Sequence, residues 1–409
     1  MEQKPEIIEV NTKHLKLRFV LFALAVVIGI VAFGTAFFQL SNRTEGYYEI
    51  TAARDEDIPL YANGIHLFCY LSGKSNAIKA DLKEAESIYT ESLSRIYRLL
   101  DADQTYEGYV NLATLNEQIG QPVALPVELY TALTDAIDRS EAFGRNPYDT
   151  ALRRAWEELL YLESPQDADP LHSPIQRERM EALAAAVREQ DAVRLDILDA
   201  TTCTVRLTVS ESLQNTLQAW EMNGPVLDLG LLREAYTLKY VAGKLRDAGF
   251  THGYLETDSG LKLLLPDSAK GDLLLYGLVN DAVVPAASVP VQGGMACCTL
   301  YTFPLEKEYG YYSVEGVLRH PYLMASGEPN TALLTAWVLA ADGDIVDAAV
   351  EALTLMDGDA ETAYSNLERY ADGASFAAVV AVDAPEMIYT DAGHMDLIAP
   401  MEGFTVFAP

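Results

Sequence analysis

The stretch LDLGLLREAYTLKYVAGKLRDAG, residues 227–249, holds the clearest boundary between two elements in this sequence. A short apolar segment ends at Gly230, and apolar residues then recur at helical spacing from Leu232 to Ala248. Gly249 follows as a typical C-terminal cap, because glycine adopts a left-handed backbone at little cost. A strand end, a glycine and a helix N-terminus in this order form the usual place to hold a phosphate. The sequence therefore predicts an anion-binding turn at the start of this helix.

Helical patterns dominate the chain before this stretch, and mixed patterns follow it. An amphipathic helix is expected from about Lys79 to Leu100, and Pro126 opens a second one, since proline is favoured at the first helical position. Further helices are expected at 150–162, 176–189 and 346–356, strands at 65–71, 205–209, 253–256, 260–265, 273–278, 296–303, 311–318 and 376–382, and a loop at 101–120. Helices first, with mixed strands and helices afterwards in one continuous core, favour an α+β fold or a layered α/β domain.

The N-terminal region contains an apolar run, residues 19–38, with no charged residue and one polar residue, Thr35. In a helix this run spans roughly 30 Å, the hydrocarbon thickness of a bilayer. Basic residues precede it more densely than they follow it, which places the N-terminus in the cytoplasm. A cleaved signal peptide is the alternative, but its apolar region is normally only about 7–15 residues long. We expect a single-pass protein of the cell membrane, with a cytoplasmic tail at 1–18, a transmembrane helix at 19–40, a linker at 41–59 and an extracytoplasmic domain at 60–409.

Charge and cysteine spacing argue against nucleic-acid binding, a disulfide framework and a zinc site. With 60 acidic and 29 basic residues the formal charge is −31, whereas a protein that binds a phosphate backbone needs a basic surface, so nucleic acid is excluded as a partner. The four cysteines form no disulfide framework, because Cys297 and Cys298 are adjacent and the others are isolated. No spacing of cysteine and histidine resembles a zinc site.

Three stretches carry polar residues that suit a binding site, although no dinucleotide-binding glycine motif, P-loop or serine elbow is present. The first is Asp228–Tyr236, at the turn described above. The second is the turn-rich loop Arg319–Pro329, in which His320 is the only histidine. In the third, Asp347 and Glu351 lie one helical turn apart on one face. Oxygen ligands so placed suit Mg²⁺ or Ca²⁺.

In this order the three stretches resemble the FAD:protein FMN transferase (ApbE-type) family. Its members carry the motifs D-L-G-G-I-A-K-G-Y, A-T-S-G, H-I-I-D-P-x-T-G-x-P and A-D-A-x-A-T. Here Ala296–Thr299 stands where A-T-S-G would lie, Ala113–Asn116 where an S-e-x-x-x-x-N segment ends, and Asn146–Thr150 resembles G-A-F-D-x-T. The resemblance covers about residues 60–360 and implies an ApbE-like flavin transferase fold of layered mixed sheet and helices.

The resemblance also implies an activity, the Mg²⁺-dependent transfer of FMN from FAD to a threonine of a target protein outside the cytoplasmic membrane. FAD, Mg²⁺ and an acceptor flavoprotein are then the expected ligands and partners. Residue by residue, the resemblance implies catalytic roles for His320 and Asp347, and metal ligation by Asp347 and Glu351. The implied FAD-binding residues are Asn116, Asp149, Asp228, Gly230, Glu234, Cys298 and His320.

Several positions depart from the family pattern. Glu234 stands where the family has a lysine, so a cation facing the pyrophosphate of FAD has become an anion. A charge contact at about 4 Å is worth on the order of 4 kcal/mol at an effective dielectric near 20, so the reversal is costly unless Glu234 is a solvated helix residue that turns away. Cys297–Thr299 replaces T-S-G, and Glu351 replaces a threonine. The alternative function is a catalytically inactive, membrane-anchored flavin-binding or scaffold domain.

The matched residues also have purely structural interpretations. His320 can hydrogen-bond within its own loop. Asp347 and Glu351 can be two acids early in an exposed helix, where the helix dipole favours negative charge. Asn116 and Asp149 can be cap or turn residues.

Overall fold

The computed structural model describes residues 43–53, 64–305, 310–324, 326–367, 375–390 and 398–407. The chain divides into two compact units, residues 1–46 with 71–83 and residues 47–70 with 84–409. The predicted cytoplasmic tail and transmembrane helix lie outside the described residues. Of the helices that are described, none is both long and apolar enough to cross a membrane.

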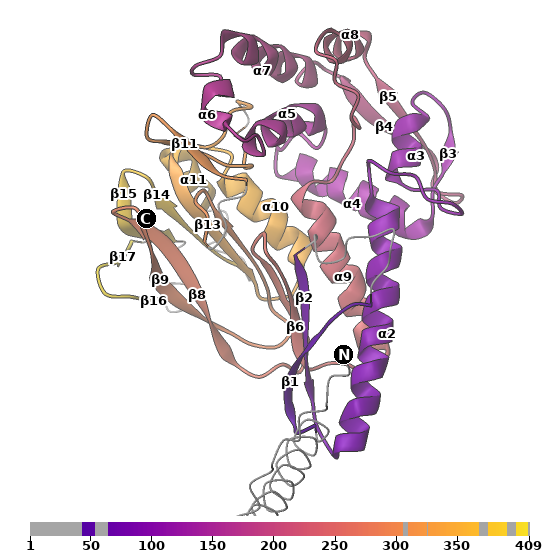
Figure 1. Ribbon diagram of the computed structural model, residues 1–409, viewed down its shortest axis with the longest axis vertical. Helices are drawn as coiled ribbons and strands as arrows, with labels where there is room; N and C mark the ends of the chain where they lie inside the picture. The colour runs from indigo at the N-terminus through magenta and orange to yellow at the C-terminus, as the bar shows by residue number, and fades with distance from the viewer. Residues whose placement is uncertain are drawn as a thin grey trace, which may run out of the picture. The chain divides into compact units, whose positions relative to one another are not determined.

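A large mixed sheet runs through the centre of the fold (Figure 1). In spatial order its strands are β1 (Gly46–Ile50), β2 (Ile65–Leu71), β6 (Gly253–Thr257), β7 (Leu261–Leu264), β10 (Ala296–Tyr301), β13 (Leu333–Ala340), β14 (Ser375–Ala381), β15 (Ala384–Thr390) and β17 (Thr405–Phe407). The pairings from β2 to β15 are antiparallel, and β17 joins β15 in parallel. Since β1 lies in the predicted linker 41–59, that segment supplies an edge strand as well as a connection.

Both faces of this sheet are covered. A second sheet of β8 (Gly271–Val279), β9 (Ala282–Val291) and β16 (Ala399–Pro400) packs its apolar side chains against one face. Helices α9 (Leu231–Asp247) and α10 (Ile345–Leu355) lie against the other (Figure 1). Trp337 of β13 packs into the core between the two sheets, and Val338 points to the opposite face, because successive side chains of a strand alternate. The result is an α+β fold with three layers.

Residues between β2 and α9 are mostly helical, and they form one wall of the cavity described below. Their helices are α2 (Ser75–Leu100), α3 (Leu112–Glu117), α4 (Val127–Ala142), α5 (Thr150–Leu160), α6 (Pro165–Ala168), α7 (Pro174–Val187) and α8 (Glu211–Ala219). Helix α4 packs on α10, and α5 packs on α6 and α7. The remaining elements are the sheet β3 (Val123–Ala124), β5 (Thr204–Val209) and β4 (Val193–Asp199), the hairpin β11 (Tyr312–Val314) and β12 (Val317–Arg319), and α11 (Ala360–Leu367).

The structure confirms the helix predicted after Gly230, which begins at Leu231 and ends at Asp247. The loop expected at 101–120 is wrong in part, because residues 112–117 form α3. Asn111 caps this helix by accepting a hydrogen bond from the Thr114 N–H at 3.0 Å. Strands β4, β9 and β13 and helix α8 lie where no element was predicted.

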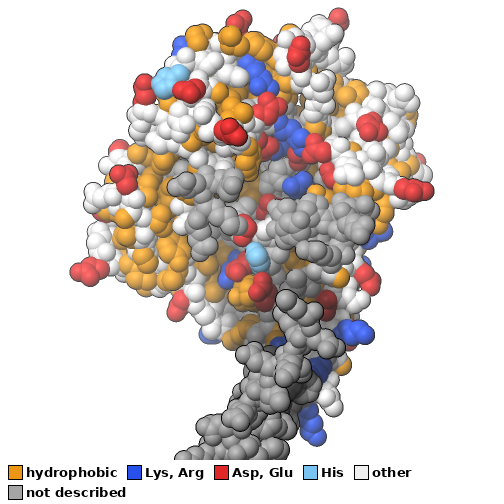
Figure 2. Space-filling model, viewed as in Figure 1, with side chains coloured by type: hydrophobic (Ala, Val, Ile, Leu, Met, Phe, Trp, Pro, Cys, Tyr) orange, Lys and Arg blue, Asp and Glu red, His pale blue; other side chains and the backbone are white. Residues whose placement is uncertain are grey.

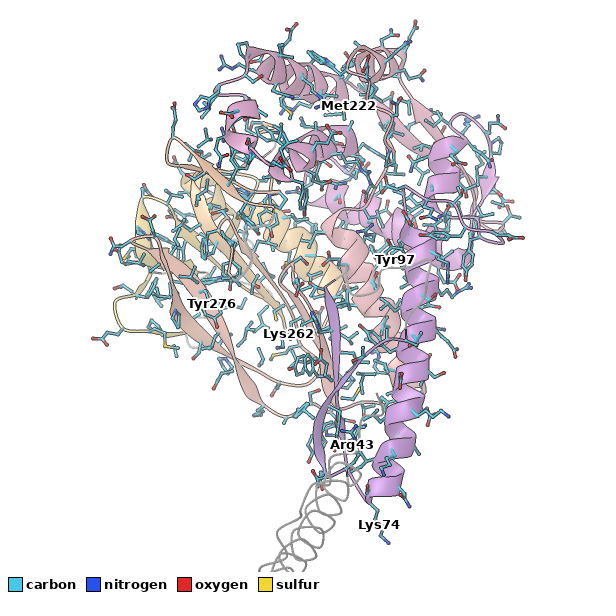
Figure 3. All side chains as sticks on the ribbon, in the orientation of Figure 1. Arg43, Lys74, Tyr97, Met222, Lys262 and Tyr276 are labelled. Atoms are coloured by element: carbon cyan, nitrogen blue, oxygen red, sulfur yellow. The ribbon has the colours of Figure 1, made fainter. Side chains whose placement is uncertain are left out.

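Side-chain contacts tie neighbouring strands together. The Lys262 ammonium on β7 lies 4.1 Å from the centre of the Tyr254 ring on β6 and 2.8 Å from Glu256 Oε2. The Tyr276 N–H on β8 donates to the Tyr301 hydroxyl on β10 at 3.4 Å, which joins the two sheets. Figure 3 labels Lys262 and Tyr276 on their strands. On the face shown in Figure 2, acidic side chains are spread widely and basic ones lie among them, in keeping with the charge of −31.

Candidate functional site

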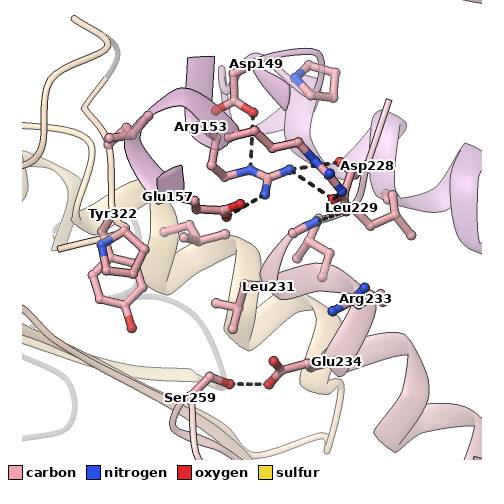
Figure 4. Close-up of a pocket in the computed structure, with 18 of the residues that line it drawn as sticks. Asp149, Arg153, Glu157, Asp228, Leu229, Leu231, Arg233, Glu234, Ser259 and Tyr322 are labelled. Atoms are coloured by element: carbon pink, nitrogen blue, oxygen red, sulfur yellow. Dashed lines mark hydrogen bonds and ion pairs between the residues drawn. The ribbon is translucent and has the colours of Figure 1, made fainter. Parts of the chain in front are cut away.

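A cavity of about 630 Å³ lies in the second unit, where α4, α5 and the start of α9 meet two loops (Figure 4). Its volume is in the range of small-molecule sites, about 300–1,000 Å³. The lining includes the turn Asp228–Glu234 and, from the histidine loop, Pro321–Leu323. Two of the three polar stretches of the sequence therefore meet at one cavity.

Asp228 fixes the turn at the start of α9. Its Oδ1 accepts a hydrogen bond from the Gly230 N–H at 2.8 Å, and its Oδ2 accepts one from Arg154 at 2.6 Å. The side chain is only 7% exposed. Burial alone would raise the pKa of Asp228, but Arg153 and Arg154 hold that pKa well below its ordinary value. Asp228 is therefore an ionised carboxylate that shapes the wall of the cavity.

Gly230 and Arg153 are in close contact beside this turn. Gly230 has a φ of 54°, and a Cβ at this position would lie 3.1 Å from the guanidinium carbon of Arg153. Arg153 donates to Glu157 Oε1 at 3.0 Å, and its Nε lies 3.9 Å from Asp149 Oδ1. Figure 4 shows Asp149, Arg153 and Glu157 together at one end of the cavity. Asp149 thus lies at the predicted site, where its carboxylate faces an arginine.

Four arginines line the cavity, and they differ in their partners. Arg153 and Arg154 bind carboxylates, and Arg145 donates to the backbone oxygen of Leu353 and lies 4.0 Å from Asp357 Oδ2. The guanidinium of Arg233, in the first turn of α9, makes neither a hydrogen bond nor a salt bridge to another described residue, and only the backbone of Arg233 is hydrogen-bonded. An unpaired cation at a helix N-terminus suits an anionic ligand, because the helix dipole acts in the same sense.

Glu234 lies at the other end of the cavity, so its interpretation as a solvated helix residue is wrong. Its carboxylate accepts a hydrogen bond from the Ser259 hydroxyl (Figure 4), and Ser259 Oγ lies 2.7 Å from Thr257 Oγ1. Burial raises the pKa of Glu234, and the hydrogen bond to Ser259 offsets only part of that rise. Tyr322 lines the same cavity, and burial is the main reason why its pKa is raised, with Glu234 contributing. A carboxylate at this end opposes an anionic ligand.

His320 does not line the cavity. Its side chain is fully buried, with Nε2 2.6 Å from the Asn330 carbonyl oxygen and Nδ1 accepting a hydrogen bond from the Tyr322 N–H at 3.2 Å. Burial lowers the pKa of His320 to about 4, so the ring is neutral. Both ring nitrogens are bound to the backbone, so neither is free toward the cavity, and the catalytic and FAD-binding roles of His320 remain predictions. His320 instead holds the loop that carries Tyr322.

Asp347 and Glu351 also lie outside the lining of the cavity. Arg139 on α4 donates to Asp347 and, at 3.0 Å, to Asp344. Glu351 is 9% exposed, and its Oε2 has no hydrogen-bond partner among the described residues. Burial and, next, the charge of Asp347 raise the pKa of Glu351 to about 8. The structure therefore does not bring Asp347 into the lining of the cavity, and its catalytic and metal-binding roles remain predictions.

Asn116 and Cys298, both predicted to bind FAD, hold structural positions instead. Asn116 Oδ1 accepts hydrogen bonds from the N–H groups of Val226 and Leu227, each at 3.0 Å, and so fastens α3 to the segment before the turn. Cys298 is buried in β10, and neither residue is part of the cavity lining. Cys297 and Cys298 are both free thiols, since neighbouring side chains of a strand point to opposite faces.

Several solved structures resemble this chain over most of its length. The ApbE protein of Thermotoga maritima has a TM-score of 0.58 at 16% identity, covering 87% of this chain and 97% of that protein. The flavin transferase ApbE of Vibrio cholerae has a TM-score of 0.56 at 13% identity, covering 87% and 99%. The flavinyl transferase ApbE of Pseudomonas stutzeri has a TM-score of 0.52 at 14% identity, covering 88% and 96%. The chain has an ApbE-like fold. No family model and no curated protein matches the sequence, so the likeness is carried by the fold.

The ApbE resemblance implies a divalent metal held by Asp347 and Glu351, and the residues present do not fit one. Mg²⁺ takes oxygen ligands at about 2.0–2.1 Å in a nearly octahedral arrangement. Here the carboxylate of Asp347 is bound by the guanidinium of Arg139. Glu351, a buried carboxyl group with a raised pKa, stands in place of a threonine hydroxyl. Across the described part of the chain, no group of three or more His, Cys, Asp or Glu side chains could hold a metal ion.

Sequence reasoning missed much of what lines this cavity. Arg153 and Arg154 follow Asp149 by one helical turn, and that pair of cations beside a predicted site residue was the one available signal. Ser259 carried no local signal, and Tyr322 lies in the predicted stretch Arg319–Pro329 without having been singled out. Both enter the cavity through turns whose position depends on the folded sheet and hairpin.

Proposed function

We propose that this chain binds a flavin nucleotide in the cavity and does not carry out metal-dependent FMN transfer. The observation that carries the proposal is the meeting of Asp228–Glu234 and Pro321–Leu323 around about 630 Å³ in an ApbE-like fold. The family resemblance implies FAD at these two segments. Arg233, unpaired among the described residues, and the N-terminus of α9 would hold the anionic part of the ligand.

Three features argue against the transfer step. Glu234 places a carboxylate where the resemblance expects the lysine that faces the pyrophosphate. His320 has no free ring nitrogen, and Asp347 is paired with Arg139. The alternative is a working FAD:protein FMN transferase with degraded motifs, which acts on a threonine of a target flavoprotein. That function requires Mg²⁺, and the residues around Asp347 do not fit this ion.

A titration of FAD into the full chain tests the binding. We expect quenching of flavin fluorescence and retention of flavin after desalting. An Arg233→Met variant should weaken binding about tenfold, or about 1.4 kcal/mol. Arg95→Met is the matched control, because Arg95 binds Glu128 at 2.7 Å and does not line the cavity. Failure to retain flavin would refute the binding proposal.

Chromatographic detection of AMP tests the transfer. The full chain is incubated with FAD, Mg²⁺ and a threonine-bearing acceptor, and we expect no AMP above the level without protein. AMP release that requires both protein and Mg²⁺ would establish the transferase instead.

We also propose that residues 19–40 anchor the domain on the outer side of the cell membrane. The uncharged apolar run and the basic residues before it support this topology. Alkaline phosphatase fused to the C-terminus should be active, since the enzyme folds only outside the cytoplasm, and the protein should resist extraction by carbonate. An inactive fusion would contradict the orientation, and carbonate extraction would contradict the anchor.

A further inference from the structure

Arg139 binds three carboxylates from two helices. It lies on α4, and its Nε donates to Asp135 Oδ1 at 2.8 Å. Tyr236 donates to the other oxygen of Asp135 at 2.6 Å. From α10, Asp347 accepts a hydrogen bond from Nη1 of Arg139, and Asp344 accepts one from Nη2 at 3.0 Å. Burial lowers the pKa of Arg139, but the hydrogen bonds to these carboxylates outweigh it and raise that pKa above its ordinary value.

The carboxylate of Asp344 is already fully used. Its Oδ1 caps α10 by accepting hydrogen bonds from the N–H groups of Val346 and Asp347, at 3.0 and 3.3 Å. Its Oδ2 binds Arg139 and lies 3.3 Å from the ammonium of Lys239. Two side-chain cations therefore supply to this cluster the two positive charges that one divalent ion would bring. Such an ion would have to displace a guanidinium.

Glu351 shows that this corner of the fold still has room for an oxygen ligand. It follows Asp347 by one turn of α10, is 9% exposed, and has one carboxyl oxygen without a hydrogen-bond partner in the part of the chain that the structure describes. Without Arg139, the carboxylates of Asp344 and Asp347 would repel each other, and their charges would disfavour ionisation of Glu351. A divalent cation would relieve that repulsion.

We propose that Arg139 is the resident cation of this carboxylate cluster and takes the place of a divalent metal. The cluster then needs no Mg²⁺ to hold α10 against α4. This inference rests on the proposed function for its relevance to the ligand. Its test measures cation binding without flavin, so the two proposals can fail separately.

Mn²⁺ is the probe, because the electron paramagnetic resonance signal of the free ion is lost on binding. We expect the full chain to bind Mn²⁺ no more tightly than about 1 mM, the weak end of carboxylate sites. Arg139→Met should bind at least tenfold more tightly, because it exposes the carboxylates. Arg139→Lys keeps a cation and should resemble the wild type. Arg95→Met removes an arginine that binds Glu128 outside the cluster, and it should also resemble the wild type.

Micromolar binding of Mn²⁺ by the wild type would overturn the proposal. Equally weak binding by the wild type and Arg139→Met would do so too, because the cluster would then not be a cation site. If Arg139→Met does not fold, thermal unfolding of the wild type decides. An unfolding temperature that neither EDTA nor Mg²⁺ changes supports a resident arginine, and a rise with Mg²⁺ refutes it.

Discussion

Replacing Gly230 by alanine tests the turn on which the cavity depends. Gly230 has a φ of 54° and a ψ of −131°, a left-handed (positive-φ) combination that residues with a Cβ rarely adopt and that costs them about 1–3 kcal/mol. The new Cβ would also lie 3.1 Å from the guanidinium carbon of Arg153, closer than ordinary van der Waals contact. Arg153 would have to move by a few tenths of an ångström, which loosens its 3.0 Å hydrogen bond to Glu157. A bond to a charged partner contributes about 1.5–3 kcal/mol, of which a partial loss is expected. We therefore expect Gly230→Ala to lower the free energy of unfolding by about 2–3 kcal/mol.

Gly243 provides a matched control in the same helix. Gly243 lies inside α9, and a Cβ there would meet no atom within 4 Å. Alanine exceeds glycine in helix propensity by about 0.8–1.0 kcal/mol, so Gly243→Ala should stabilise the protein by roughly that amount. Glycine-to-alanine changes thirteen residues apart should thus have opposite signs.

Urea denaturation followed by tryptophan fluorescence and by circular dichroism measures both variants. The comparison holds where the slope of the free energy against urea is the same for all three proteins. Flavin binding by Gly230→Ala should also weaken, because the turn lines the cavity. If Gly230→Ala equals or exceeds the wild type in stability, then the turn does not have the left-handed geometry. The packing of Gly230 against Arg153, and the turn that Asp228 fixes, would then be refuted.

Three further substitutions test other contacts. Arg319→Met should lower the free energy of unfolding by about 3–5 kcal/mol, because it leaves the buried carboxylate of Asp169, which Arg319 binds at 2.8 and 3.2 Å, without its cation. Urea denaturation measures the loss, and a loss under about 1 kcal/mol would contradict the pairing. Burial lowers the pKa of His320 to about 4, so between about pH 6.5 and pH 4 only the unfolded state takes up a proton there, and the free energy of unfolding of the wild type should fall by about 3 kcal/mol. In denaturation measured across the same pH range, His320→Asn should lack this part of the loss. Identical pH profiles for the two proteins would exclude a neutral buried ring. Glu234→Lys should tighten FAD binding at least tenfold, about 1.4 kcal/mol, in the fluorescence titration, because a cation replaces a carboxylate in the cavity; an unchanged affinity would mean that Glu234 does not face the phosphates.

The parts of the fold that the sequence predicts are those with local causes. Helix α9 follows from its apolar spacing, from Gly230 before it and from Gly249 after it. Helix α10 was found in the same way, and Asp344 caps it with hydrogen bonds at 3.0 and 3.3 Å. The order of motifs led to the ApbE resemblance, which the solved structures bear out at the level of the fold.

Strand β13 escaped prediction for a physical reason. All of Leu333–Ala340 is buried, because the second sheet covers one face and α10 the other. A strand with two buried faces shows a continuous apolar run instead of alternation, and such a run does not distinguish a strand from a buried helix. Its register against β10, with Cys298 opposite Val338, is a property of the assembled sheet.

The chemistry of the candidate site was harder to predict because its contacts are distant in sequence. Arg139 and Asp347 are 208 residues apart, and no motif links them. The same holds for His320, whose residue type suits catalysis but whose two ring nitrogens are both bound to the backbone. Spacing located these residues correctly along the chain. Packing determined which of their atoms remained free.

Charge compensation links these observations. Asp228 binds Arg154, Asp347 binds Arg139, and Asp344 binds Arg139 and Lys239. Asp228 and Asp347, which the resemblance assigns to ligand and metal, thus have their counter-charges within the chain, and the folded state needs no external cation at those two places. Glu234 differs from these residues, because burial disfavours its charged form and, among the described residues, no arginine donates a hydrogen bond to it. A fold can keep its turns and helix ends while the side chains at those positions exchange their chemistry. We propose that in this chain Arg139 takes the place of a metal and that the Arg233 side chain is the cation available to a ligand in the cavity.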